Sequence, residues 1–437
     1  MKQNREFRKR EVLPGGIRLL SERIPHVRSI ALGVWYTTGS RDEARGEYGI
    51  SHLIEHMVFK GTTNRSTEEI ASSLESLGGH LDAFTTKEST CYTARVLDEH
   101  LPAAVDVLGD ILQNSLFLSE ELEKEKKVIL EEMKSSEDSP DEVSFEVLTK
   151  AVFNGHPLSI PILGTRKSLR NVKRKKIQAR IKKSYIPSRM VVAAAGNVHH
   201  QELSELIQKT FHLRHIPSSK FHAELDSAPN KSHPESSSGP IPNSPRLRSR
   251  KRRDISQVHV SLGTATIPYG HPDRYALTLL NTIFGGSMSS RLFQKVREER
   301  GLVYAIHSFP VLYTDVGLWG IYFAADPKKY KEAAQIVFSE FKQLRREGLR
   351  KDELSNAKAQ VKGNLTLSLE STSQRMYRLA QSEIYLGKFF STDETLRKID
   401  RVRPEEVMRL AETLLDPSQI SISIVGPVSK PRWGEFF

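Results

Sequence analysis

Two histidines and a glutamate stand close together in the pentapeptide His52-Leu53-Ile54-Glu55-His56. On a helix, residues four apart lie about 40° from each other around the axis, so both imidazoles can face one metal ion. Glu55 falls roughly 60° to the other side of His52, where its carboxylate can act beside the metal without binding it. The pentapeptide therefore predicts a metal-binding helix with a carboxylate next to the ion.

A third candidate ligand, Glu132, comes 76 residues after the second histidine. Glu125 lies seven residues before it, in a segment predicted to be helical over residues 119–147. Val128 and Ile129 fall between the two glutamates at helical spacing. We expect this apolar stripe to carry both glutamates toward the interior, where a charge needs a partner. A solvated face bordered by these glutamates is an equally balanced alternative, because many charged residues surround them.

The flanks of the pentapeptide place it early in a buried helix. Ser51 is a favourable N-cap, and Met57, Val58 and Phe59 continue an apolar run. Two imidazoles and a carboxylate buried together need partners, which a metal ion would supply. The pentapeptide alone is also compatible with two solvated histidines on an ordinary helix.

Two imidazoles and one carboxylate leave the fourth position of a tetrahedral zinc ion open for water, as in catalytic sites. Cys91 is the only cysteine, so a cysteine-rich structural site is excluded. A single cysteine also permits no internal disulfide and agrees with a reducing compartment.

The chain of 437 residues contains two similar halves. Residues 187–198 and 417–428 each form a predicted strand bounded by turn residues, and they are offset by 230 residues. Matching strands are also predicted near residues 29 and 258. Each half mixes strands and helices without the strict alternation of a parallel sheet, which indicates an α+β fold.

We predict three parts: an N-terminal zinc-binding catalytic domain (residues 1–213), a flexible Ser-, Pro- and Lys/Arg-rich linker (214–253), and a homologous C-terminal domain (254–437). The metal motif shifted to the second half falls near residues 279–283, which hold neither histidine nor acid. The counterpart of Glu132 falls near Asn364. The C-terminal domain is therefore expected to lack the metal site and to bind substrate.

The pentapeptide, the segment EKEKKVILEEM and the intervening GGHLDAFTTKESTCYTARVL together resemble the pitrilysin/insulinase family of inverted (HxxEH) zinc metallopeptidases. The closest resemblance is to its short subgroup, which includes the mitochondrial processing peptidases and bacterial relatives. It covers nearly the whole chain except about residues 214–252. It implies two homologous α/β-sandwich-like domains, each a mostly antiparallel sheet packed with helices, which face each other like a clamshell.

The same resemblance implies functions for the polar residues. His52, His56 and Glu132 would bind one zinc ion per chain, and Glu55 would be the general base. Glu125 matches a family glutamate two helical turns before the third ligand, which would contact the zinc ligands without binding the ion itself.

Two further segments resemble substrate-binding parts of the family. Ala83, Phe84 and Thr85 match the edge strand along which the substrate peptide lies. Asp82, just before them, stands where relatives usually have asparagine, so a negative charge replaces an amide donor near that strand.

Arg297 and Tyr304 match a family pair that reaches toward the substrate. Their guanidinium and phenol groups are suitable donors to peptide carbonyls or to the oxyanion formed during attack. The residues alone favour a simpler interpretation, a charged helix surface followed by an ordinary strand aromatic.

These observations predict a zinc metalloendopeptidase that hydrolyses extended or unfolded peptides with a metal-activated water. The alternative is a non-catalytic scaffold or partner subunit of a heterodimeric peptidase, although such chains typically lose parts of the metal motif. Because short family members commonly form dimers, we expect a homodimer or a heterodimer with a related chain.

The net charge of +12 is unevenly spread. Residues 166–183 hold ten basic residues and no acid, and residues 246–253 form a second basic cluster. No zinc-finger or RNA-binding signature accompanies them, so a solvated face and a basic linker are preferred to a nucleic-acid partner. No apolar run is long enough to cross a membrane. The N-terminus lacks both a secretory h-region and a long acid-poor presequence, which favours the bacterial cytoplasm over the mitochondrial matrix.

Overall fold

The computed structural model describes residues 7–211, 245–429 and 431–436. The chain forms two compact units, and each unit is built from three separate stretches of sequence. Unit 1 comprises residues 1–132, 160–237 and 368–389, and unit 2 comprises residues 133–159, 238–367 and 390–437.

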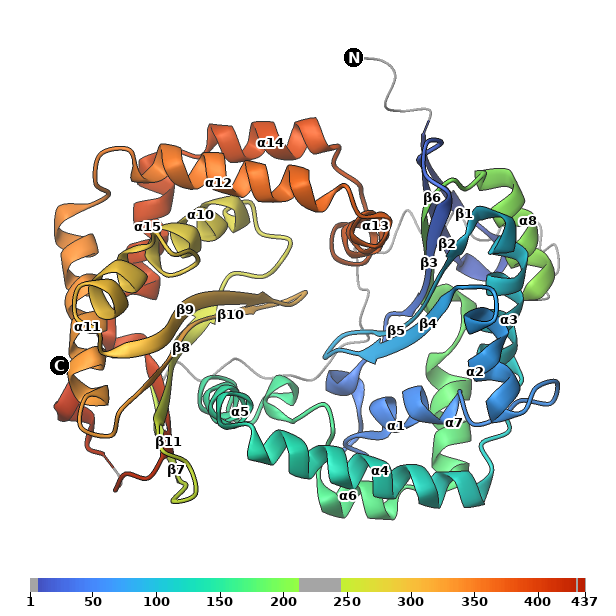
Figure 1. Cartoon of the computed structure of the whole chain (residues 1–437), viewed down its shortest axis with the longest axis horizontal. Coiled ribbons are helices and arrows are strands. Elements are labelled where there is room, and N and C mark those ends of the chain that lie inside the picture. The colour runs from blue at the N-terminus through green and yellow to red at the C-terminus, as the bar shows by residue number, and fades with distance from the viewer. Residues whose placement is uncertain (1–6, 212–244, 430, 437) are drawn as a thin grey trace. The chain divides into compact units, whose positions relative to one another are not determined.

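Unit 1 is built on a six-stranded sheet in the order β1-β2-β6-β3-β5-β4 (Figure 1). Only β2 and β6 pair in parallel, and the other neighbours are antiparallel. The small and β-branched residues of β6 are buried throughout, as expected for a strand covered on both faces. The strands are β1 (Arg8–Val12), β2 (Arg18–Arg23), β3 (Ser29–Tyr36), β4 (His80–Thr85), β5 (Thr90–Leu97) and β6 (Met190–Gly196).

Helices cover both faces of this sheet. One face packs against α3 (Leu101–Gln113) and α8 (His200–Thr210), and the other against α13 (Thr372–Leu386) (Figure 1). An apolar cluster joins Trp35 of the sheet to Met376 and Leu379 of α13. Among the described residues, the remaining α-helices of unit 1 are α1 (Ile50–Met57), α2 (Thr67–Glu75), α6 (Arg166–Asn171), α7 (Arg174–Ser184) and the first part of α4 (Ser119–Asp138).

Unit 2 has a five-stranded sheet in the order β7-β11-β8-β10-β9. On one face lies α5 (Pro140–Val152), and on the other α10, α11 and α15 surround a core that contains Trp319 and Phe341 (Figure 1). The elements are β7 (Leu247–Lys251), β8 (Val258–Thr266), β9 (Val303–Leu312), β10 (Gly317–Ala325), β11 (Ser421–Gly426), α10 (Arg274–Phe284), α11 (Tyr330–Glu347), α12 (Glu353–Ser368), α14 (Thr392–Arg401) and α15 (Pro404–Leu414).

The two sheets repeat the same strand order. When β1 is set aside, the series β2-β6-β3-β5-β4 corresponds to β7-β11-β8-β10-β9. In both sheets the only parallel pair joins the first two strands of that series. The structure thus confirms the duplication and the α+β class.

The two halves exchange one helix. α5 lies in the N-terminal half of the sequence and packs in unit 2, whereas α13 lies in the C-terminal half and packs in unit 1. The compact units therefore differ from the contiguous stretches 1–213 and 254–437 expected from the sequence. Amphipathic periodicity shows that a helix has a buried face, but it does not show which sheet buries it.

The predicted linker ends earlier than expected. Residues 212–244 lie outside the described part of the chain, but residues 247–251, inside the predicted linker, form β7 and pair in parallel with β11. The prediction of a flexible segment up to residue 253 was wrong for this strand, because its sequence is basic and has no apolar alternation. Within the described residues, none of the helices combines the length and the apolar character needed to cross a bilayer.

Candidate metal centre

The helix α1 carries the pentapeptide, and a remote carboxylate holds its first turn. Its N-cap is Gly49, with a φ of +90°, and not Ser51 as the sequence suggested. A side chain at Gly49 would meet the carbonyl of Leu163, so glycine is required there. The buried carboxylate of Glu43 accepts the N–H groups of Gly49 and Ser51 at 2.7 and 2.8 Å. Glu43 therefore replaces the missing cap.

Three predicted ligands meet in unit 1. The Nε2 atoms of His52 and His56 lie 3.7 and 3.8 Å from the two carboxylate oxygens of Glu132. All three donor atoms lie within 4.8 Å of one another. These distances suit three ligands around one ion of the size of zinc, and two imidazoles with one carboxylate leave a fourth position open. No second group of this kind occurs in the described ranges.

Glu125 fixes the orientation of the second imidazole. Its Oε2 lies 3.0 Å from Nδ1 of His56, and its Oε1 lies 2.9 Å from Nζ of Lys60. Glu125 is buried, so the ammonium of Lys60 supplies the counter-charge that the carboxylate needs there. With Nδ1–H donated to Glu125, the lone pair of Nε2 faces Glu132 and is free to bind a metal.

His52 is neutral in this environment. Burial, followed by the neighbouring His56, lowers its pKa to about 4. A metal ligand must be an unprotonated imidazole, so His52 is ready to bind at neutral pH. Its Nδ1 atom is buried and has no hydrogen-bond partner among the described residues, unlike Nδ1 of His56.

Glu55 occupies the position expected of a general base. It is buried in the same turn of α1, and the hydroxyl of Thr85 donates to its Oε2 at 2.5 Å. Burial raises the pKa of Glu55, the hydrogen bond from Thr85 lowers it, and the charge of Asp82 makes a smaller upward contribution. A carboxylate held in this way can accept a proton from a nearby water.

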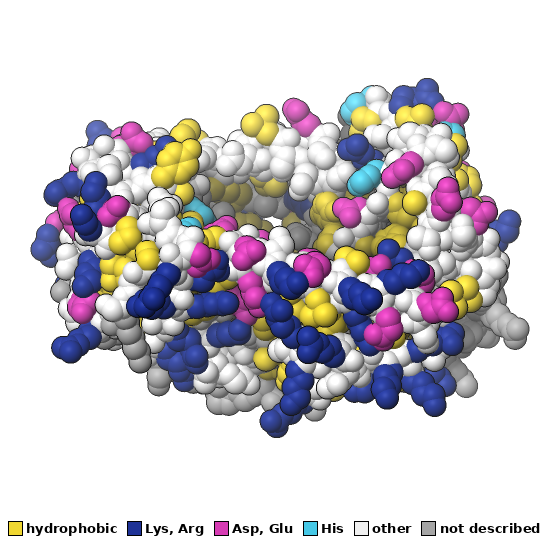
Figure 2. Space-filling view, turned by 60° about the horizontal axis from the view of Figure 1, so that its bottom comes forward, with side chains coloured by type: hydrophobic (Ala, Val, Ile, Leu, Met, Phe, Trp, Pro, Cys, Tyr) yellow, Lys and Arg dark blue, Asp and Glu magenta, His cyan; other side chains and the backbone are white. Residues whose placement is uncertain are grey.

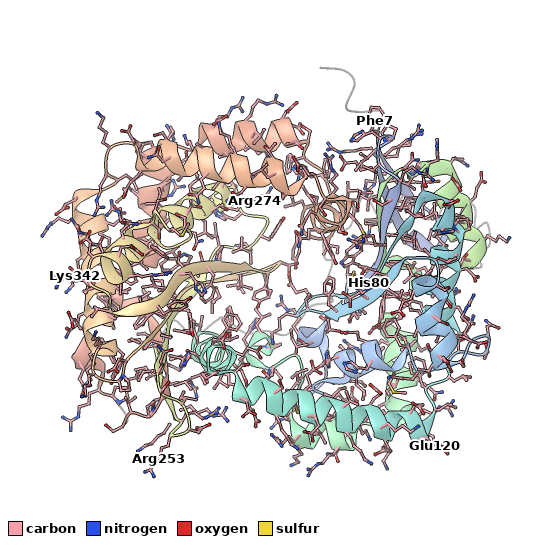
Figure 3. The ribbon with its side chains drawn as sticks, in the orientation of Figure 1. Phe7, His80, Glu120, Arg253, Arg274 and Lys342 are labelled. Atoms are coloured by element: carbon pink, nitrogen blue, oxygen red, sulfur yellow. The ribbon has the colours of Figure 1, made fainter. Side chains whose placement is uncertain are left out.

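The stripe predicted for α4 is only partly correct. Ile129 is fully buried and Glu125 is 5% exposed, but Val128 is 49% exposed. The core-facing stripe is narrower than the i, i+3, i+4, i+7 pattern suggests, because most of α4 is solvated. Glu132 stays partly exposed, with 44% of its side chain accessible, although it faces the two imidazoles. Figure 3 labels Glu120, at the start of α4.

The predicted substrate strand is a sheet edge. Ala83, Phe84 and Thr85 belong to β4, which ends the sheet order of unit 1 and has β5 as its single partner. His80, labelled in Figure 3, marks the first residue of β4. An edge strand of this kind presents unpaired backbone groups to which an extended peptide can add.

Arg297 and Tyr304 both belong to unit 2. Arg297 lies in a π-helical turn, and Tyr304 lies on β9 with 79% of its surface exposed. The guanidinium of Arg297 lies over the rings of Phe293 and Tyr304, at 4.6 and 5.2 Å from their centroids. The two residues therefore form one local group, and their contact with substrate stays a prediction.

Sequence reasoning missed two residues of the centre. Lys60 stands three residues beyond the end of α1, where helical periodicity gives no signal. No local sequence signal links Glu43 to α1, because the loop between them brings it back to the helix start.

The first basic cluster forms a solvated surface. Of the ten basic residues between 166 and 183, all except Arg180 are exposed on or beside α6 and α7. Arg180 instead donates to the carbonyl of Asp42 and to Thr38. Figure 2 turns the lower side of Figure 1 toward the viewer and shows Lys and Arg side chains spread among Asp and Glu side chains.

Comparison with known families gives two matches. Residues 18–166 match the family described as Insulinase (Peptidase family M16), and residues 171–361 match the Peptidase M16 inactive domain. The first match contains all three candidate ligands. The second covers most of the half that repeats the fold without the metal motif.

Similar proteins come from several bacteria. One from Mycobacterium tuberculosis is 38% identical over 97% of this chain and 94% of that protein. One from Bacillus subtilis is 38% identical over 96% of this chain and 98% of that protein. Both are described as uncharacterized zinc proteases.

Solved structures share the fold at lower identity. A protease from Helicobacter pylori has a TM-score of 0.87 at 21% identity, covering 96% of this chain and 99% of that one. A protein from Pseudomonas fluorescens, titled as a peptidase M16 inactive domain, has a TM-score of 0.84 at 18% identity, covering 97% of this chain and 99% of that one.

Proposed function

This chain belongs to the insulinase family of zinc proteases, peptidase family M16, and from that premise we propose that it is an endopeptidase acting on extended or unfolded peptides. The observation that supports it most directly is the convergence of His52, His56 and Glu132 donor atoms within 4.8 Å. A charged carboxylate and two imidazoles that meet at a partly open position are a catalytic rather than a structural ligand set.

The side chains divide the work as follows. His52, His56 and Glu132 would hold one zinc ion, which lowers the pKa of a bound water and polarises a carbonyl group. Glu55 accepts a proton from the attacking water and returns it to the leaving amine. Thr85 keeps the Glu55 carboxylate oriented through the 2.5 Å hydrogen bond. Glu125, neutralised by Lys60, keeps His56 in the tautomer that presents Nε2.

The substrate backbone would add to β4. Main-chain hydrogen bonds at Ala83 and Thr85 would align the peptide, and this recognition depends on backbone more than on side chains. Arg297 and Tyr304 would supply donors to the peptide or to the oxyanion. We further propose that the protein works as a homodimer or with a related chain.

The alternative function, a non-catalytic partner subunit, is less well supported. A chain that only serves as a scaffold has no need of a complete ligand set, a neutral His52 and a buried carboxylate in the position of a base. All of these are present in unit 1.

The Glu55→Gln variant tests the proposal. It keeps the size and the Thr85 contact but removes the proton acceptor, so we expect bound zinc at the wild-type level and cleavage of an unfolded peptide reduced at least about 1,000-fold. Metal analysis and a peptide cleavage assay on the same preparations provide the measurement. Wild-type cleavage by this variant, or cleavage by wild-type protein that survives a zinc chelator, would show that the mechanism is wrong.

A further inference from the structure

The free side of β4 presents backbone groups from alternate residues. β4 and β5 are joined by a short turn in which the N–H of Thr86 donates to the carbonyl of Ser89 at 2.7 Å. Antiparallel pairs alternate between hydrogen-bonded and non-bonded positions. Counting back from this pair, Phe84 and Asp82 direct their backbone groups to β5, and Ala83 directs its own to the open edge.

One of these edge donors is already occupied. The N–H of Ala83 donates to Oδ1 of Asp82 at 2.8 Å. Asp82 is exposed, and none of the ion pairs among the described residues includes it. A carboxylate without an ion-pair partner among the described residues thus accepts the N–H of Ala83 in the middle of β4. An added strand would use that same N–H.

The side chain of Asp82 lies on a defined face of the sheet. Phe84, two residues on, shares that face, and its ring lies 5.9 Å from the ring of Tyr377 on α13. A peptide that pairs with β4 would place one side chain beside Asp82 on this face, with Cβ atoms about 5 Å apart. Opposite charges in such cross-strand pairs stabilise a sheet, and like charges destabilise it.

We propose that Asp82 makes the enzyme prefer extended peptides with a lysine or arginine at the single position beside it. An incoming backbone carbonyl displaces the Asp82 carboxylate from the N–H of Ala83, and the released carboxylate then pairs with the cationic side chain of the peptide. A neutral peptide loses the carboxylate contact without replacement, and an acidic peptide is repelled.

The surrounding charges confine the preference to that position. Arg95 lies opposite His80, on the same face but at the other end of β4. Lys87, within the turn between β4 and β5, donates to the carbonyl of Ile160. Asp82 is thus the carboxylate on this face of β4, and a cation opposite His80 would face the like charge of Arg95 one strand further in.

The inference rests on the proposed peptidase function, and a substrate series tests it. One unfolded peptide with a single cleavage site is prepared with Lys, Gln or Glu at each position near that site. For wild-type protein we expect kcat/KM to be about fivefold higher for Lys than for Glu at one position, with a smaller ratio at high salt. Asp82→Asn and Asp82→Ala should bring this ratio close to one.

Glu202→Gln is the matched control, because it removes one exposed carboxylate from α8 of the same unit and should leave the ratio unchanged. Equal Lys-to-Glu ratios in wild type and Asp82→Asn would overturn the inference while leaving the peptidase function standing. Failure of zinc-loaded wild-type protein to cleave every peptide in the series would instead count against the proposed function.

Discussion

The candidate metal centre depends on the protonation and the orientation of each candidate ligand. Burial keeps His52 neutral, and Glu125 with Lys60 orients His56. Burial thus controls the protonation of His52, whereas the contacts of Glu125 control the orientation of His56. The orientation of His56 is the easier of the two to disrupt, because it depends on single hydrogen bonds of a buried carboxylate.

Replacing Glu125 by glutamine should weaken metal binding. Glutamine keeps the size but is neutral, and its oxygen cannot serve both His56 and Lys60 as the carboxylate does. We expect zinc affinity to fall about 10- to 100-fold, measured by competition with a chelator. Glu121→Gln is the control on the same helix, because Glu121 pairs with the exposed Lys124. Unchanged affinity in Glu125→Gln would mean that the contact with His56 does not support the ligand.

The sequence indicated the three side chains that meet at the candidate site more clearly than the residues that contact them. His52 and His56 are four residues apart, so on a helix they lie on the same face. Glu132 is seven residues after Glu125, so it continues the same face of α4. Lys60 and Glu43 were missed because their contacts cross a helix end or a loop, where periodicity carries no information. Val128 was assigned to the core because an apolar residue on a charged helix was given too much weight.

At the scale of elements, the start of α1 is set by a loop rather than by its own cap. Glu43 holds the N–H groups of Gly49 and Ser51, and Arg41, two residues earlier, forms a buried ion pair with Glu88 at 2.5 Å. The loop between β3 and α1 is thereby tied to the turn between β4 and β5. The helix that carries the ligands and the strand proposed to bind substrate therefore share one support.

The Glu43 carboxylate should make stability depend on pH. Burial raises its pKa from the ordinary value of 4.5 to about 7, against the opposing hydrogen bonds from Ser51 and Gly49. The protonated form is thus favoured in the folded state. The contribution of protonated Glu43 to the free energy of unfolding is fully present below about pH 4.5. It is lost as the pH rises through 7, with a full effect of about 3 kcal/mol.

Glu43→Gln removes this titration and shows its size. The stability of metal-free wild-type protein relative to the variant should fall between pH 5 and pH 8, measured by denaturant unfolding. Glu47→Gln, in the same loop, should show no such difference, because Glu47 makes only a 3.3 Å contact with Lys176. A constant difference between Glu43→Gln and wild type across this range would show that Glu43 keeps an ordinary pKa in the fold.

At the scale of the whole molecule, duplication and helix exchange determine which parts can fold. The offset of 230 residues predicted matching strands in the two halves. Applied to β2, the same offset points to β7, which lies inside the segment that the sequence analysis interpreted as linker. The exchange of α5 and α13 left no signal in the sequence. A helix with one apolar face fits either of two similar sheets, and only the packed structure shows which one it covers.

The exchange predicts that the N-terminal half is incomplete by itself. Without α13, a fragment of residues 1–213 exposes the apolar face of its sheet around Trp35, which α13 covers through Met376, Leu379 and Ala380. It also leaves Arg10 and Arg18 without Glu383, a buried partner on α13. We expect this fragment to unfold without a sharp transition, to bind a hydrophobic dye and to bind zinc weakly.

The same fragment followed by a Gly/Ser linker and residues 368–389 should recover a cooperative transition and zinc binding. In the linked form, Met376→Asp places an unpaired charge in the apolar cluster and should abolish the recovery. A cooperative transition and tight zinc binding by residues 1–213 alone would show that α13 is dispensable for the fold of unit 1.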